Sequence, residues 1–143
     1  MAEFLIRGYN VAVPEVDVGD DIFVVKDSSG DYARVQVKTA LAAETRNGYS
    51  ARYTVRFSQL EVQSVPEIWY IFANRLTNRW VSFVVISRQD LYDLYDLYGI
   101  GSLNRTGLLS LYFAYSADSV VCSGQNLGSF LNNWDDWPPI EHE

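Results

Sequence analysis

The stretch DIFVVKDSSGDYARVQVKTA, residues 21–40, holds two apolar runs separated by a turn signal. Both runs are rich in valine and aromatic residues, which favour β-strands. The residues between them, Ser28-Ser29-Gly30-Asp31, are of the types that form tight turns. The stretch therefore predicts a β-hairpin.

Two polar side chains, Gln36 and Lys38, interrupt the second run and alternate with valines. Side chains along a strand point to alternate faces, so these two share one face and Val35 and Val37 share the other. Closing the hairpin brings Asp21, at the start of the first strand, near the end of the second. We therefore expect Asp21, Gln36 and Lys38 to converge at one edge of the sheet.

A carboxylate, an amide and an ammonium at one edge suit the chemistry of phosphate esters. Mg²⁺ prefers oxygen ligands, which Asp21 and the Gln36 carbonyl supply. The metal would polarise a phosphate and lower the pKa of a bound water. Lys38 would hold that water or the charge that develops on phosphorus. The pattern predicts hydrolysis of a phosphodiester without histidine, with Mg²⁺ as cofactor and Mn²⁺ as a substitute.

A simpler interpretation of the same residues stays open. Asp20 and Asp21 are also typical of a turn that precedes a strand. Gln36 and Lys38 also suit the solvent-exposed face of a half-buried sheet. The residues alone do not choose between the two interpretations.

The composition limits the chemistry that the chain can perform. The 143 residues fit one domain, 1–143, and His142 and Cys122 are the only histidine and cysteine. This argues against Ser-His-Asp, Cys-His and His-rich zinc sites. A single cysteine forms no internal disulfide and fits a reducing, cytoplasmic compartment. No apolar run is long enough to span a membrane, so we expect no membrane partner.

The remaining patterns predict a mixed central β-sheet flanked by helices, an α/β single domain. Helices are expected at residues 2–7, 88–98 and within 123–134. Strands are expected at 9–13, 49–60, 68–76, 79–87 and 108–116. The strands 68–76 and 79–87 are expected to form a second hairpin across Thr77-Asn78. Gly99 is expected to end the helix 88–98.

The stretch PEVDVGDDIFVVKDSSGDYARVQVKTA, residues 14–40, resembles the core of the PD-(D/E)xK nuclease superfamily. It is most similar to the branch in which Gln replaces the second acid, as in some intron-encoded homing endonucleases. Asp21 matches the family aspartate, and Gln36-Val37-Lys38 matches its (D/E/Q)xK element. The resemblance covers residues 2–40. It implies a restriction-endonuclease-like fold, Mg²⁺-dependent DNA cleavage, and a homodimer that cuts both strands.

One position departs from the family pattern. Active members carry a further glutamate on the first helix, and Glu3 is the only acid in the helix expected here. Glu3 also suits an ordinary exposed position. The resemblance therefore leaves two functions open: a DNA endonuclease, or an inactive relative that binds DNA or a protein.

The net charge of −7 is unevenly distributed. Residues 31–60 carry five basic and two acidic side chains, whereas residues 89–143 carry one and eight. Arginine grips phosphate bidentately, so the basic stretch predicts a DNA-binding groove or, equally, a solvated strand face. The arginines concerned are Arg34, Arg46, Arg52 and Arg56.

The aromatic residues divide into two groups. Alternation predicts that Trp69, Tyr70, Trp80 and Phe83 are buried in the core rather than available for stacking on bases. Trp134 and Trp137, near the end of the chain, suit either a seal over the sheet or a partner contact, and the sequence does not decide between these.

Overall fold

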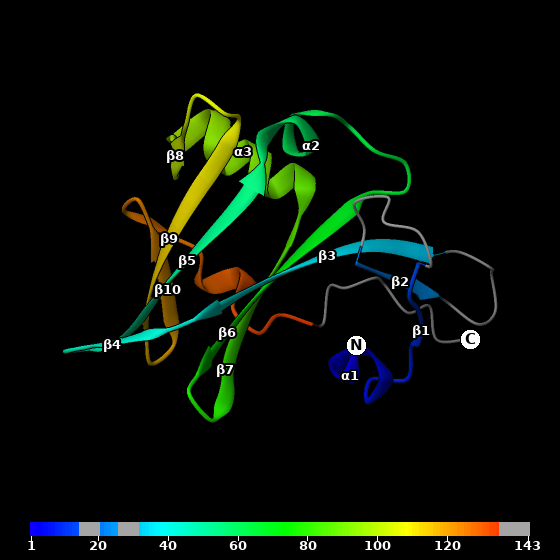
Figure 1. Ribbon diagram of the computed structural model, residues 1–143, viewed down its shortest axis with the longest axis horizontal. Coiled ribbons are helices and arrows are strands. Elements are labelled where there is room, and N and C mark those ends of the chain that lie inside the picture. The colour runs from blue at the N-terminus through cyan, green and yellow to red at the C-terminus, as the bar shows by residue number, and fades with distance from the viewer. Residues whose placement is uncertain (15–20, 26–31, 135–143) are drawn as a thin grey trace.

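The computed structural model describes residues 1–14, 21–25 and 32–134 (Figure 1). Its helices are α1 (Ala2–Leu5), α2 (Phe57–Glu61) and α3 (Arg88–Tyr98), with a 3₁₀ turn η1 at Gly128–Phe130. Its strands are β1 (Asn10–Ala12), β2 (Ile22–Val25), β3 (Tyr32–Leu41), β4 (Ala43–Thr45), β5 (Gly48–Arg56), β6 (Ile68–Leu76), β7 (Arg79–Ser87), β8 (Ser102–Leu103), β9 (Leu108–Ser116), β10 (Ser119–Cys122) and β11 (Gln125–Asn126). The chain forms a single small domain of mixed α/β content that is mostly sheet.

The first sheet has the strand order β1-β2-β3-β6-β7. Strand β2 runs antiparallel to both β1 and β3, strands β3 and β6 run parallel, and strands β6 and β7 run antiparallel. Both predicted hairpin pairings, β2 with β3 and β6 with β7, are confirmed. The parallel pair is possible because β4, β5 and α2 carry the chain back to the starting end of β3.

A second, antiparallel sheet has the order β11-β10-β9-β5-β4, with β8 beside β9. The sequence had predicted one central sheet flanked by helices. The difference arises because β5 pairs with β9, which lies far along the chain, through the register Arg52 with Tyr112. Such non-local pairing leaves no mark on local periodicity.

The main core fills the space between the two sheets. Tyr53 of β5, Phe72 of β6 and Phe113 of β9 are each at most 3% exposed. The ring centroid of Phe72 lies 5.0 Å from that of Tyr53 and 5.2 Å from that of Phe113. Edge-on contacts of this kind add to the free energy of apolar burial.

A second core covers the opposite face of the first sheet. Phe4 of α1 is 1% exposed, and Trp134 packs against it at a centroid distance of 5.4 Å. Trp134 also meets Phe83 of β7 at 5.5 Å. Trp134 therefore seals this face, while Trp137 lies outside the described residues.

Helix α3 has the ends that its sequence predicts. The Ser87 hydroxyl accepts a hydrogen bond from the Asp90 N–H at 3.0 Å, which caps the first turn. Gly99 ends the helix in the left-handed conformation with φ of 65°, as its position implies. Leu91 is fully buried and fixes the helix on the main core.

Three predicted elements differ in extent. The first helix ends at Leu5 rather than at residue 7, and the strand predicted for 49–60 ends at Arg56 because Phe57 and Leu60 turn inward on the short helix α2. The helix predicted within 123–134 is wrong. Ser123 and Gly124 both have positive φ, which makes the tight turn of a β10–β11 hairpin, and only η1 is helical there.

The predicted burial of Trp80 is also wrong, because its side chain is 53% exposed. Strand β7 contains one extra residue, so that Asn74 pairs with Ser82 but Arg75 pairs with Trp80. A bulge shifts the alternation by one and turns the following side chains to the other face. Tyr70 is buried as expected, and Trp69 and Phe83 pack against the second core.

None of the helices in the described part of the chain combines the length and apolar character needed to cross a membrane.

Candidate functional site

Asp21 precedes β2 directly, and its carboxylate is held against β3. The register pairs Ile22 with Val35, so Asp21 stands at the level of Gln36. The Asp21 N–H donates to the Val35 carbonyl at 2.9 Å. Its Oδ2 accepts a hydrogen bond from the Val37 N–H at 2.6 Å. The carboxylate thus lies at the residue that separates Gln36 from Lys38.

Gln36 and Lys38 share the face of β3 that is turned towards the second sheet. Their partners on β6 are Tyr70 and Phe72, which both belong to the main core. Gln36 is only 7% exposed, and Lys38 is half-buried. The two side chains therefore lie at the margin of the core and not on an open, solvated face.

The carboxylate of Asp21 occupies the point where one edge of β3 loses its strand partner. On the β6 side, β3 remains paired as far as Leu41. On the β2 side, the ladder ends with Ile22 and Val35. The next N–H on that edge, from Val37, is satisfied by the side chain of Asp21 instead of a backbone carbonyl.

One oxygen of Asp21 remains for a ligand. The bond to Val37 uses Oδ2, and Oδ1 makes no hydrogen bond among the described residues. The residue as a whole is exposed. A hydrogen bond to one oxygen of an exposed carboxylate fixes its orientation and leaves the other oxygen able to coordinate a cation. Carboxylates that bind metals in proteins are commonly hydrogen-bonded in this way.

The residues around Asp21 fit a weakly held hard cation better than a tight site. Within residues 1–14, 21–25 and 32–134, no three His, Cys, Asp or Glu side chains gather as a metal site would require. Asp21 and the Gln36 amide oxygen would supply two ligands. Mg²⁺ commonly keeps several waters and binds through one or two carboxylates, so two protein ligands suit it.

Glu3 takes part in an ion pair on α1. Its carboxylate accepts a hydrogen bond from Arg7 Nη1, and the same nitrogen donates to the Glu3 carbonyl at 2.9 Å. The Arg7 guanidinium carbon in turn lies 4.6 Å from the ring centroid of Trp134. These contacts give Glu3 a local structural partner, in line with the interpretation of Glu3 as an ordinary helix residue.

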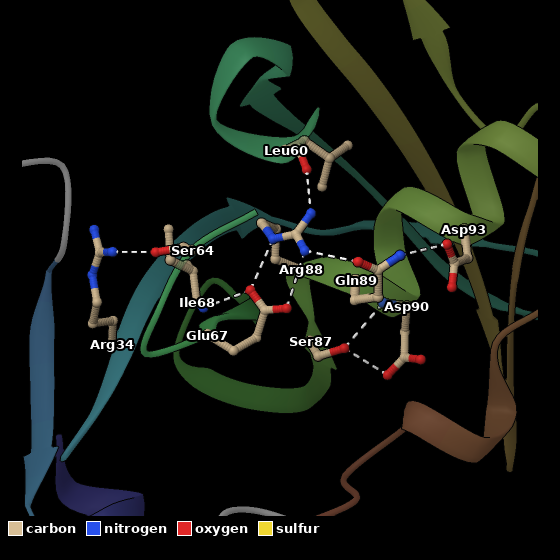
Figure 2. A network of polar contacts seen from close by, with 10 residues as sticks. All are labelled: Arg34, Leu60, Ser64, Glu67, Ile68, Ser87, Arg88, Gln89, Asp90 and Asp93. Atoms are coloured by element: carbon tan, nitrogen blue, oxygen red, sulfur yellow. Dashed lines mark hydrogen bonds and ion pairs between the residues drawn. The ribbon is translucent and has the colours of Figure 1, made fainter. Parts of the chain in front are cut away.

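The four arginines of the predicted groove lie in three different places. Arg34 shares the face of Gln36 and Lys38 and donates to the Ser64 hydroxyl (Figure 2). Arg46 lies in the turn between β4 and β5. Arg52 and Arg56 alternate with buried residues of β5 and are exposed on the outward side of the second sheet. Only Arg34 is placed next to the Asp21 edge by the strand register.

An ion pair that the local sequence patterns do not indicate joins the buried Arg88 to the partly exposed Glu67 (Figure 2). Arg88 is 1% exposed. Its Nε donates to Glu67 Oε1 at 2.8 Å and its Nη2 to Oε2 at 3.1 Å, which is the bidentate geometry that arginine favours. Its Nη1 donates to the Leu60 carbonyl at 2.8 Å, at the end of α2.

The Arg88–Glu67 pair is structural, since the bonds from Arg88 to Glu67 and to the Leu60 carbonyl tie separate chain segments together. Glu67 also accepts from the Ile68 N–H at 2.9 Å, so the pair joins α2, the start of β6 and the start of α3. The sequence contained a signal for the Arg88–Glu67 pair. The β6–β7 register, Trp69 with Ser87, puts the two opposite charges at the same end of the hairpin.

A cluster of buried tyrosines lies between the sheets. The hydroxyls of Tyr53 and Tyr115 are 3.3 Å apart. Burial raises the pKa of Tyr53 to about 12 and also raises the pKa of Tyr115. Both phenols therefore stay protonated at neutral pH, where they pack and donate hydrogen bonds rather than act as bases.

The chain matches no protein-family model, and searches of curated proteins and of solved structures found no similar protein.

Proposed function

We propose that the protein is a metal-dependent phosphodiester hydrolase that acts on DNA at the Asp21–Gln36–Lys38 edge. One observation supports this most. The Asp21 carboxylate is fixed by Val37, the residue between Gln36 and Lys38, through a hydrogen bond of 2.6 Å. The carboxylate of Asp21 therefore lies beside the positions of Gln36 and Lys38 on β3, and these are the residue types that a phosphate site needs.

Each residue has a distinct role in this proposal. Asp21, through Oδ1, and the Gln36 carbonyl would hold Mg²⁺ or Mn²⁺. The bound ion would polarise the phosphate and make its water a better nucleophile. The Val37 N–H keeps Asp21 in one orientation. The Lys38 ammonium would bind a non-bridging oxygen of the phosphate and stabilise the charge that builds on it during attack.

The chain order of the elements supports the finer family proposal. A helix, a strand, a strand that Asp opens and a strand that carries Gln-x-Lys follow one another as α1, β1, β2 and β3. This is the order that a restriction-endonuclease-like core would have. A homodimer would bring two such edges to the two strands of a duplex.

The test measures cleavage of a mixed pool of single-stranded, duplex and branched DNA with Mg²⁺ or Mn²⁺. Wild type is compared with Lys38→Ala, and Arg79→Ala serves as a matched loss of one exposed charge elsewhere. We expect Lys38→Ala to reduce the rate by about 10²–10³, because a donor that acts mainly in the transition state is lost. If Lys38→Ala cleaves DNA as fast as Arg79→Ala, Lys38 does not take part in the reaction.

A second candidate function, DNA binding without cleavage, is favoured by the burial of Gln36. An amide that is 7% exposed has little room to turn its oxygen to a metal. The hydrogen bond from Val37 also gives Asp21 a purely structural task, because it caps an open strand edge. Metal-independent DNA binding by wild type, with no cleavage of any pool member, would favour this function.

A further inference from the structure

The outward face of the second sheet carries an aromatic residue and two arginines that the phosphodiester site does not use. Tyr112 of β9 is 51% exposed, and its direct cross-strand partner on β5 is Arg52, which is also exposed. Arg56 lies on the same face, four residues further along β5. At 3.3 Å per residue, the two arginines are about 13 Å apart. Strands β5 and β9 run side by side (Figure 1).

The charge of this face is opposite to that of the whole chain. The protein has a net charge of −7. Among the described outward-facing positions of the second sheet, the charged side chains are Arg52 and Arg56. The cross-strand partner of Arg56 is Leu108, and the other positions of this face on β5 and β9 beside Tyr112 include the small or hydroxylated residues Ser50, Thr54, Ser110 and Ala114. A positive face on an acidic protein selects a negatively charged partner.

We propose that this face binds single-stranded nucleic acid, with an unpaired base stacked on Tyr112 and the adjacent phosphates bound by Arg52 and Arg56. The binding does not depend on cleavage, since the face lies on the far side of the second sheet from the Asp21 edge.

The shape of the face selects a single strand over a duplex. A duplex hides the flat faces of its bases and is read by an element that enters a groove. The face is a sheet, and the longest described helix, α3, is acidic on its exposed positions Asp90 and Asp96. An exposed ring in a sheet, with arginine beside it, is instead suited to stacking on an unpaired base.

One carboxylate lies near the end of the face. Arg56 lines a hollow of about 570 Å³ together with Glu61, Ser58 and Thr106. Glu61 would repel a phosphate that reaches Arg56. Removal of its charge is therefore expected to tighten binding, which is the opposite of what damage to the fold would do.

The experiment measures fluorescence anisotropy of a labelled thymidine oligonucleotide and of the same strand annealed to its complement, both with a metal chelator present. Tyr112→Ala should weaken binding of the single strand about tenfold, since loss of one stacked base has an effect of this order. The affinity of Tyr112→Phe for the single strand should stay within about twofold of that of wild type, because the ring is kept. Glu61→Gln should bind more tightly.

The chain offers a matched control pair at the β6–β7 hairpin. Trp80 is 53% exposed and is the cross-strand partner of the exposed Arg75. Trp80→Ala should leave binding unchanged if the face on the second sheet is the site. The double variant Arg52→Ala with Arg56→Ala should reduce the slope of log affinity against log salt by about 1.4, at about 0.7 for each single-strand phosphate.

Four outcomes of the binding measurements would overturn the proposal. They are no binding of the single strand by wild type, binding that Tyr112→Ala leaves intact, loss of binding on Trp80→Ala instead, and tighter binding of the duplex than of the single strand. Self-association that Tyr112→Ala abolishes, without oligonucleotide binding, would assign the face to a second copy of the chain and would equally overturn it.

Discussion

Arg88 and Asp21 are two charged residues at strand ends, but their surroundings differ. Arg88 is 1% exposed and donates to Glu67, Leu60 and Gln89. Asp21 is exposed and its side chain accepts one hydrogen bond, from Val37. A buried charge needs partners for its whole hydrogen-bonding capacity, whereas an exposed charge can keep one atom for a ligand.

The comparison teaches how to separate structural from functional charges in this fold. Removal of Arg88 should act on stability, because it leaves Glu67 and the Leu60 carbonyl without their partner. Removal of Asp21 should act mainly on metal or phosphate binding, because water replaces it at small cost.

Arg88→Met should destabilise the fold by about 3 kcal/mol, the lower end of the range for breaking a buried ion pair, because Arg88 is buried whereas the Glu67 side chain is 31% exposed and water can hydrate it. Urea unfolding at neutral pH measures the change. Arg75→Met, at an exposed arginine, is the matched control and should change stability by about 0.5 kcal/mol or less. A loss below about 1 kcal/mol for Arg88→Met would show that the pair does not hold α2, β6 and α3 together.

High pH should weaken the fold through Tyr53 and Tyr115. Burial raises the pKa of Tyr53 from the ordinary 10.0 of a tyrosine to about 12 in the folded protein. The contribution of the protonated Tyr53 phenol to the free energy of unfolding is therefore fully present below pH 10 and is lost as pH rises through about 12. For Tyr53 it amounts to roughly 2–3 kcal/mol.

Urea unfolding at pH 8 and at about pH 11 measures this dependence on pH. Tyr53→Phe should be less sensitive to high pH than wild type, because it removes the group that ionises. Tyr112→Phe is the control, since that ring is exposed. If the two variants lose the same free energy of unfolding between these pH values, burial of Tyr53 is not the cause.

Asp21→Asn should cost about 1 kcal/mol of stability, because an amide oxygen still accepts from the Val37 N–H but without charge. The midpoint of urea unfolding reports this cost. A cost near that of Arg88→Met would make Asp21 a structural residue, and the difference between the two regions would disappear.

Trp80→Ser should change stability by about 0.5 kcal/mol or less, because the bulge in β7 turns this side chain into solvent. Thermal unfolding compares it with Trp134→Ser, which opens the second core and should cost several times more. Equal losses for the two variants would place Trp80 in a packed environment.

The sequence predicted what depends on neighbours along the chain. The alternation in β2 and β3 and the turn at Thr77-Asn78 were sufficient for both hairpins, and register then placed Asp21 beside Gln36. It did not predict the second sheet, because β5 pairs with β9 across many intervening residues. It misplaced Trp80 because one extra residue reverses the alternation, and a bulge has no local signature here.

For the candidate site, the sequence indicated which residues share a face of β3 but not what surrounds that face. Periodicity put Gln36 and Lys38 on one face, and that face proved to be the one turned towards the second sheet. Its burial depends on the non-local sheet. The bond from Val37 to Asp21 depends on where β2 stops, which the alternation of side chains does not specify.

The central claim, that Asp21 and Gln36 hold a metal beside Lys38, is tested most directly by titration of Mn²⁺ followed by amide NMR. Paramagnetic Mn²⁺ broadens the signals of nuclei close to it. The signals of the Val37 backbone amide and the Gln36 side-chain amide should broaden first, and Asp21→Asn should abolish this broadening while the rest of the spectrum is unchanged. Broadening that starts elsewhere, or that survives Asp21→Asn, would contradict it.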